Sequence, residues 1–209
     1  MRVFCLVSLL LASFGSISAD DTQPKKMKFK INEKEYRFSN YFEFSSEDTP
    51  VGVIVKKRFA YLHLTSHYEA YNDMGVWEAT GVSRLFSLGS LFSWATEIDV
   101  KDTSNKVIGM IDGQIATLAS ARFSIYECDD AHNWHLKGIA FMDNEKRSFS
   151  IVDPNNDKHM LVSLKRILLL NERDHWECQV FDTDAIDLRI VKVFAAFAVD
   201  HQEYFRVDN

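Results

Sequence analysis

Residues 185–205 read AIDLRIVKVFAAFAVDHQEYF, and the location of the apolar run Leu188–Val199 within them decides the fold. Only two of the twelve residues in this run, Arg189 and Lys192, carry a charge. A helix that spans a membrane needs roughly 20 apolar residues, so the run is too short for a span. A helix that is apolar on nearly all sides is enclosed by protein. The rest of the chain must therefore supply the enclosure.

Short runs in which apolar and polar residues alternate dominate the sequence from Met27 to Asp182, a pattern typical of strands with one buried face. Six of these runs begin 26 to 28 residues apart: FEFSSED at Phe42, YEAYND at Tyr68, TEIDVKD at Thr96, FSIYECDD at Phe123, FSIVDPN at Phe149 and WECQVFD at Trp176. Each of the first five is followed by a turn and a second run. So regular an interval indicates a repeated supersecondary unit, here a hairpin.

Five hairpins, the first strand MKFKI and the last strand at Trp176 together predict about twelve strands. A sheet this long tends to close on itself. A closed barrel of about twelve strands is wider than wall side chains fill, since about eight strands already give a packed interior. We therefore predict a mainly β protein, a closed antiparallel barrel around a C-terminal hydrophobic helix over about 184–200. The run Leu188–Val199 would be about 18 Å long as a helix, close to the height of six-residue strands.

The beginning of the chain has the pattern of a secretory signal peptide. One basic residue, Arg2, precedes an apolar run, and small residues precede Asp20. We expect residues 1–19 to be the signal peptide, 20–26 a short N-terminal segment and 27–209 the barrel domain. An uncleaved anchor is the alternative. The expected localisation is export, to the periplasm or outside the cell, without a transmembrane segment.

A formal net charge of −6 and the shortness of the cationic runs argue against nucleic-acid binding, which needs a concentrated basic face. The runs are Lys25, Lys26, Lys28 and Lys30, then Lys56, Lys57 and Arg58, then Lys165 and Arg166. The simplest interpretation of each run is the solvated edge of a strand. The second and third runs end the return strands of the first and fifth hairpins, so we expect them near the same rim of the barrel.

Three stretches resemble the LURP-one-related and tubby C-terminal-like proteins, a group to which phospholipid scramblases are related. They are VKKRFAYLHLTSHYEAYND, SRLFSLGSLFSWATEIDVKD and ARFSIYECDD, with a basic strand end, an FSLG-like linker, an aromatic strand and an acidic turn in that order. The resemblance covers roughly Met27 to Val199 and implies a twelve-stranded barrel around a central hydrophobic helix. Some members bind phosphoinositide head groups through exterior basic residues, and this chain has no clear counterpart of their basic pocket.

The densest group of reactive side chains is CDDAHNWH, which contains Cys128, Asp129, Asp130, His132 and His135. Metal binding is one interpretation of this group. However, side chains three residues apart point to opposite faces of a strand, and no second ligand set at zinc-type spacing occurs in the sequence. We prefer a solvated turn. Other hairpin tips are also acidic, which we attribute to Asp and Asn stabilising turns, with a calcium site as the alternative.

The sequence contains neither a G-x-S-x-G elbow nor a phosphate-binding glycine loop. We therefore expect no cofactor, no metal and no enzymatic activity. We also expect Cys128 and Cys178 to remain unpaired. Cys128 lies five residues after Phe123 and Cys178 two after Trp176, and this odd difference places them on opposite faces of the sheet.

These observations predict an exported, non-catalytic barrel that binds anionic lipid head groups at a membrane surface. The residues expected to contact the lipid are Lys56, Lys57, Arg58, Lys165 and Arg166. The alternative is an extracytoplasmic protein-interaction or scaffold module. If the protein is such a module, its binding should not depend on lipid charge.

Overall fold

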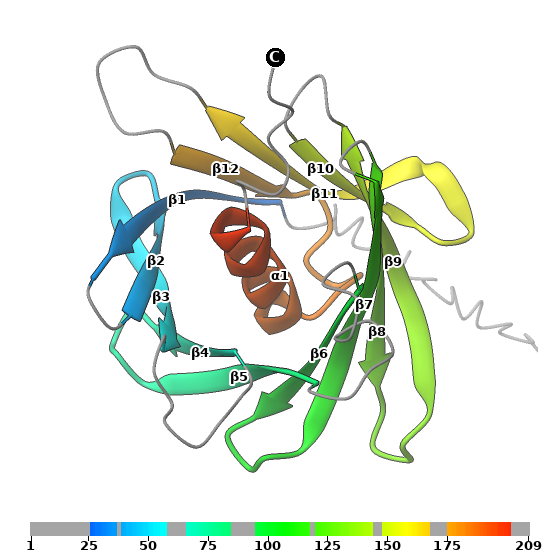
Figure 1. Ribbon diagram of the computed structural model, residues 1–209, viewed down its shortest axis with the longest axis horizontal. Coiled ribbons are helices and arrows are strands. Elements are labelled where there is room, and N and C mark those ends of the chain that lie inside the picture. The colour runs from blue at the N-terminus through cyan, green and yellow to red at the C-terminus, as the bar shows by residue number, and fades with distance from the viewer. Residues whose placement is uncertain are drawn as a thin grey trace, which may run out of the picture.

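Twelve strands form a closed barrel around one helix in the computed structural model (Figure 1). The structure describes residues 26–36, 39–57, 66–84, 95–117, 120–143, 148–167 and 175–201. The strands are β1 (Met27–Glu35), β2 (Ser39–Ser46), β3 (Thr49–Lys57), β4 (His67–Asn72), β5 (Trp77–Ser83), β6 (Ala95–Asp102), β7 (Val107–Thr117), β8 (Ser120–Cys128), β9 (Trp134–Asp143), β10 (Ser148–Asp153), β11 (Asn156–Ile167) and β12 (His175–Val180), and the helix is α1 (Leu188–Asp200). The predicted signal peptide, residues 1–19, lies outside the described residues.

Every strand pairs antiparallel with its neighbours along the chain, and β1 closes the ring by pairing with β12. In the closing ladder Met27 lies opposite Val180 and Ile31 opposite Trp176. The predicted fold class, a closed antiparallel barrel of about twelve strands with a C-terminal helix, is confirmed.

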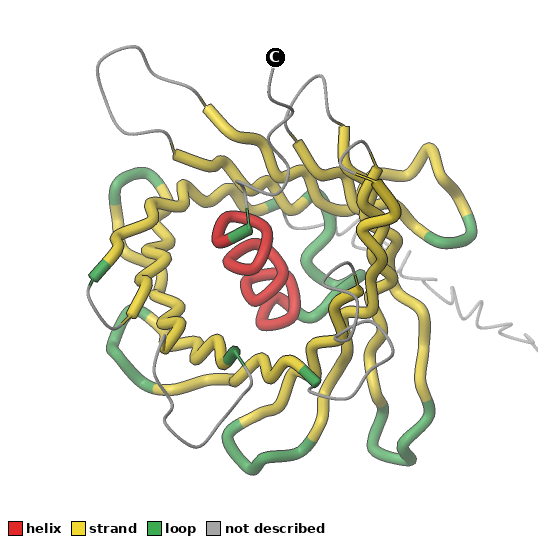
Figure 2. Tube along the Cα trace, in the orientation of Figure 1, coloured by secondary structure: helices red, strands yellow, loops and turns green. Residues whose placement is uncertain are grey.

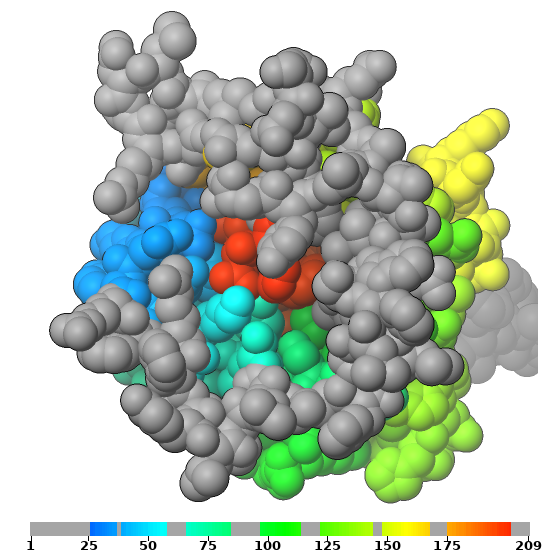
Figure 3. Space-filling model, viewed as in Figure 1, coloured from blue at the N-terminus to red at the C-terminus, as the bar shows by residue number. Residues whose placement is uncertain are grey.

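The helix α1 lies inside the barrel (Figures 1 and 2), and its atoms are visible within the ring of strands in the space-filling view (Figure 3). Nine of its residues are buried. Phe194 makes edge contacts with Phe123 and Phe149, and both pairs of ring centroids are 5.6 Å apart. Within the described residues, no helix has the length and apolar character that crossing a membrane requires.

The helix begins at Leu188, later than the expected start near residue 184, because Asp187 caps it. The Asp187 carboxylate accepts a hydrogen bond of 2.8 Å from the backbone N–H of Arg189. Such a side chain satisfies a backbone donor that has no partner in the first turn, and so fixes where the helix starts. The Asp187 N–H in turn donates to the Glu127 carboxylate of β8 at 2.6 Å, which ties the start of the helix to the wall.

The 26-to-28-residue interval corresponds to successive hairpins whose first residues occupy equivalent positions on the inner face of the barrel. The first residues of five repeats are buried on the inner wall: Phe42, Tyr68, Phe123, Phe149 and Trp176. The side chain of the sixth, Thr96, is not among those described. The repeat predicted from the sequence is therefore a repeat of the barrel wall.

Each of the five hairpins also carries a one-residue bulge on its return strand. The bulged residues are Val51, Glu78, Ile108, Lys137 and Leu161. A bulge bends its strand and increases the local twist, which helps a long sheet to close. Two of the bulge residues are charged and form ion pairs. Glu78 pairs with Lys192 of α1 at 3.4 Å, and Lys137 pairs with Glu127 at 3.4 Å.

The wall approaches α1 so closely that two inner positions require glycine. A Cβ added at Gly109 would lie 2.3 Å from Cδ1 of Ile190, and one added at Gly81 would lie 2.6 Å from Cγ1 of Val193. A missing side chain often marks a close approach of another element. These glycines let the helix pack against β5 and β7.

Cys128 and Cys178 are free thiols, as predicted. Cys178 is buried on the inner face of β12, and burial raises the pKa of its thiol to about 12. Cys128 ends β8, which three strands separate from β12 around the ring. Strand order therefore keeps the two sulfur atoms apart.

Replacing Phe194 by Asp should destabilise the protein severely, because a carboxylate would be buried without a partner among aromatic rings. We expect the free energy of unfolding to fall by about 4 kcal/mol or more. Urea denaturation followed by tryptophan fluorescence measures this change. Phe194→Leu is the control and should cost about 1–2 kcal/mol. Similar stabilities for the two variants would show that Phe194 is not enclosed.

Candidate functional site

The five basic residues predicted to bind lipid do not form one exterior patch. Lys56 follows the buried Ile54 by two residues and points to the inside of the barrel, where its ammonium group pairs with Asp200 and lies 5.6 Å from the centre of the Tyr68 ring. Its side chain is only 18% exposed. Arg166 also occupies an inner-face position, opposite the buried Trp176. These two residues do not belong to an exterior lipid-binding surface, because strand alternation turns them inward.

Lys57 and Lys165 do face outward, at the rim where β3 and β11 both end. Lys57 is paired with Glu69 at 2.6 Å, whereas Lys165 is exposed. Strands β2, β1 and β12 lie between them, which corresponds to about 19 Å of wall at the usual strand spacing. The two runs share a rim, as expected, but not a patch. Arg58 lies outside the described residues.

A different group of lysines gathers on the outside of β1. Lys26, Lys28 and Lys30 alternate in sequence with Met27, Phe29 and Ile31. Phe29 and Ile31 are 1% and 0% exposed, so the lysines on the other side of the strand face solvent. Their period-two spacing was the sequence signal for this row, which we had interpreted only as a solvated edge.

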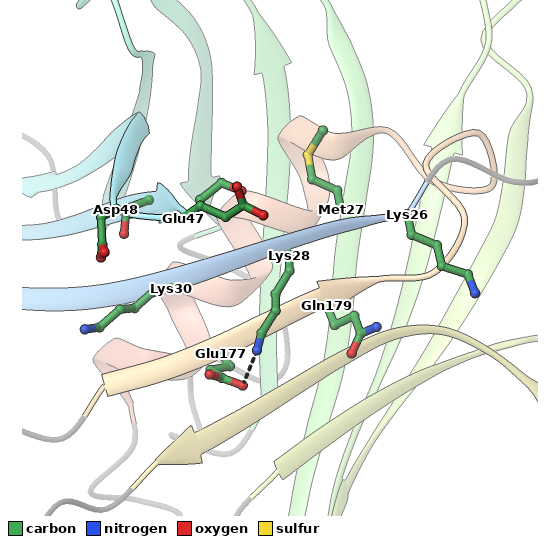
Figure 4. Close-up of a pocket in the computed structure, with 10 residues that line it drawn as sticks. Lys26, Met27, Lys28, Lys30, Glu47, Asp48, Glu177 and Gln179 are labelled. Carbon is green, nitrogen blue, oxygen red and sulfur yellow. Dashed lines mark ion pairs between the residues drawn. The ribbon is translucent and has the colours of Figure 1, made fainter.

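Closure of the barrel adds Lys165 to this row. Lys30 lies opposite Glu177 of β12, and Glu177 in turn lies opposite Lys165 of β11. The Lys28 Nζ is 3.0 Å from Glu177 Oε2 (Figure 4). We call Lys26, Lys28, Lys30, Lys165 and Glu177 the lysine face. It is a row of four lysines with one carboxylate among them, on a protein whose net charge is −6.

The lysine face borders a cavity of about 650 Å³ on the outer wall. The cavity is lined by Lys26, Met27, Lys28, Lys30, Ser45, Ser46, Glu47, Asp48, Glu177 and Gln179. In Figure 4, Lys28 points toward Glu177, whereas Glu47 and Asp48 lie on the other side of β1. A second cavity of about 580 Å³ shares Lys30, Ser45 and Asp48 with the first. Together they hollow this part of the outer wall.

A second polar group, which we call the Asp200 cluster, closes the other end of the helix. Asp200 accepts a hydrogen bond of 2.8 Å from the Tyr68 hydroxyl and pairs with Lys56, and His201 Nδ1 lies 3.3 Å from its carboxylate. Asn40 Nδ2 donates to Asp200 at 3.4 Å, while Asn40 Oδ1 is buried without a partner among the described residues. These five residues, Asn40, Lys56, Tyr68, Asp200 and His201, fix the end of α1 to β2, β3 and β4.

Burial controls the ionisation of the Asp200 cluster. The pKa of Tyr68 lies well above its ordinary value, first because the hydroxyl is buried and then because Asp200 is negatively charged. The pKa of His201 is lowered because burial outweighs the opposing effect of Asp200. Near neutral pH the cluster therefore holds a neutral phenol and a neutral imidazole around the Lys56–Asp200 pair. Tyr68 acts as a hydrogen-bond donor there.

Three acidic residues at hairpin tips, Asp102, Asp129 and Asp153, bond to their own turns, as the sequence indicated. Asp129 accepts hydrogen bonds from the backbone N–H of Asn133 at 2.8 Å and from His135 at 3.1 Å. The pKa of Asp129 falls well below its usual range, mainly because of the backbone hydrogen bond from Asn133. Asp102 and Asp153 accept bonds from Ser104 and Asn155 in the same way. In the part of the chain that the structure describes, no three His, Cys, Asp or Glu side chains are placed to hold a metal ion.

Comparison of the chain with protein-family models, with curated proteins and with solved structures finds no match. The lysine face and its cavity are therefore the features from which we infer a function.

Replacing Lys56 by Met should destabilise the barrel, because Asp200, whose side chain is 5% exposed, would lose its cation. Breaking a buried ion pair from one side costs about 3 kcal/mol or more, whereas removing both charges costs less. We therefore expect Lys56→Met to lower the free energy of unfolding by about 3 kcal/mol and Lys56→Met/Asp200→Asn to recover part of that loss. Equilibrium urea melts of wild type, both single variants and the double variant measure the coupling. Strictly additive effects would mean that the pair does not interact.

Proposed function

We propose that this protein is an exported, non-catalytic barrel that binds anionic lipid head groups through the lysine face. The observation that supports the proposal is the row of outward-facing lysines at the closing ladder, where Lys30 of β1 and Lys165 of β11 lie on either side of Glu177 and Lys28 pairs with it. Of the described residues that the sequence predicted to bind lipid, Lys165 alone belongs to this surface. Lys57 lies on another part of the wall, where it is paired with Glu69.

Charge at this surface suits weak, reversible attachment. Each basic residue near an anionic membrane contributes about 1 kcal/mol. Four lysines, one of them paired with Glu177, would supply a few kcal/mol. Screening limits the reach of exposed charges to about 8 Å at physiological ionic strength. Binding should therefore weaken as salt rises, even though the protein as a whole is acidic and is repelled at longer range.

The non-catalytic part of the proposal is supported by the contacts of the histidines. His135 and His159 lie beside the turn carboxylates Asp129 and Asp153, and His201 bonds to the end of α1. Each of these imidazoles serves a turn or a helix end. A general base needs instead a reactive group within hydrogen-bonding reach.

A protein-interaction module is the second candidate, and the β4–β5 turn favours it. Met74 and Val76 are 78% and 55% exposed there, and the neighbouring Trp77 is 38% exposed. Tryptophan is enriched at the energetic centres of protein interfaces. Binding through this turn would be insensitive to the charge of a lipid surface.

Flotation with vesicles separates the two candidates. We expect wild type to float with vesicles that contain phosphatidylglycerol at low salt, to float less at high salt, and to stay at the bottom with phosphatidylcholine alone. The variant Lys28→Gln/Lys30→Gln/Lys165→Gln should lose most of its binding. The matched control, Lys34→Gln/Lys106→Gln/Lys158→Gln, removes the same charge elsewhere and should float like wild type. Equal loss in both variants would leave only a net-charge effect, and no flotation at all would favour the protein-interaction module.

Export is tested by the N-terminal sequence of the protein recovered after expression with its first residues intact. We expect the recovered chain to begin at Asp20, because small residues precede this position after an apolar run. A chain that still begins at Met1 would contradict export through a cleaved signal peptide.

A further inference from the structure

The cavity beside the lysine face contains charges of both signs that do not neutralise one another. Lys28 and Glu177 form an ion pair across it. The other charged lining residues are two lysines, Lys26 and Lys30, and two acids, Glu47 and Asp48. Among the described residues, no ion pair or hydrogen bond joins these lysines to these acids. The cavity therefore offers two unpaired cations and two unpaired carboxylates to one ligand.

The register places these opposite charges close together. Lys30 of β1 lies opposite Ser45 of β2, and Glu47 and Asp48 follow two and three residues later in the turn between β2 and β3. In Figure 4 the acidic side chains lie across β1 from the Lys28–Glu177 pair. A ligand in the cavity thus meets the ammonium group of Lys30 on β1 and the carboxylates of the turn.

The backbone holds both carboxylates at the tip of the hairpin. Glu47 and Asp48 have φ angles of 48° and 63°, the left-handed conformation that two-residue hairpin turns adopt. Asn-Gly is the usual sequence of such turns, because glycine adopts this conformation without strain. The chain instead has two acidic residues here, and both remain exposed. The turn therefore presents negative charge where smaller residues would fold more easily.

We propose that the cavity recognises the head group of a phospholipid that carries a primary amine as well as its phosphate. The phosphate lies against Lys30, and the ammonium group donates hydrogen bonds to Glu47 and Asp48. A head group without an amine meets the same lysine but is repelled by the two carboxylates. An ammonium group has three donors and charge-assisted bonds to carboxylates are the stronger kind, so the amine converts this repulsion into attraction.

This inference rests on the proposed lipid-binding function and adds selectivity to it. If anionic lipid binds but head groups with and without an amine bind equally, the selectivity fails while the proposed function stands. If no vesicle binds, both fail.

The test compares vesicles of equal net charge, made from phosphatidylcholine with either phosphatidylserine or phosphatidylglycerol. We expect the full chain to bind the phosphatidylserine vesicles about threefold more tightly, a ratio within the range that an exposed ion pair provides. Glu47→Gln/Asp48→Asn should remove the preference and strengthen binding to phosphatidylglycerol, because the repulsion is gone. These replacements keep the turn, since Asn adopts left-handed conformations readily.

Two outcomes separate recognition of the amine from other effects. Phosphatidylserine also carries a carboxylate, so a preference that persists in Glu47→Gln/Asp48→Asn would come from the lysines alone and would overturn the proposal. The control Asp157→Asn/Asp184→Asn removes two exposed acids elsewhere and should retain the preference. If this control loses it as well, overall charge rather than the turn sets selectivity, and the proposal is again overturned.

Discussion

Enclosure of one apolar helix by a closed sheet is the constraint on which the rest of the structure depends. Neither part can bury its apolar surface alone: the inner face of the wall carries buried phenylalanines and isoleucines, and α1 has apolar residues on nearly all sides. Each buries its apolar surface against the other. At roughly 25 cal/mol for each Å² removed from water, burial on this scale is the main favourable contribution to folding. The apolar residues of the inner face are consequently committed to packing.

Both ends of the helix need polar partners, because the backbone N–H and C=O groups of a helix end have no partner within the helix. At the first end Asp187 caps α1, and Glu127 binds the cap. At the last end the chain places an acidic residue, Asp200, where the helix dipole favours a cation. Lys56, Tyr68 and Asn40 compensate for it. Lys56, which the sequence analysis assigned to a lipid-binding surface, therefore pairs with Asp200 inside the barrel.

The lipid-binding function that we propose uses the outer face of the barrel. Alternation sends Lys28 and Lys30 outward because Phe29 and Ile31 go inward, and closure of the ring brings β11 and β12 beside them. The turn that carries Glu47 and Asp48 completes the cavity. The resulting surface combines both signs of charge, in contrast to a uniformly basic patch. Its chemistry suits a small dipolar head group better than a long polyanion.

The sequence alone determined most of the fold, because strand alternation, the 26-to-28-residue repeat and the apolar run at Leu188–Val199 are local or periodic signals. It also determined that Cys128 and Cys178 would not pair. The candidate site could be predicted less well from the sequence. Which face of β3 is buried depends on where the core lies, so Lys56 could be interpreted as an exterior cation until the fold placed Asp200 beside it. The position of Lys30 and Lys165 on either side of Glu177 depends on the ladder that joins the first strand to the last. Only the tertiary structure decided these two arrangements, because pairing between distant segments is set by closure of the whole sheet and leaves no periodic trace in either segment.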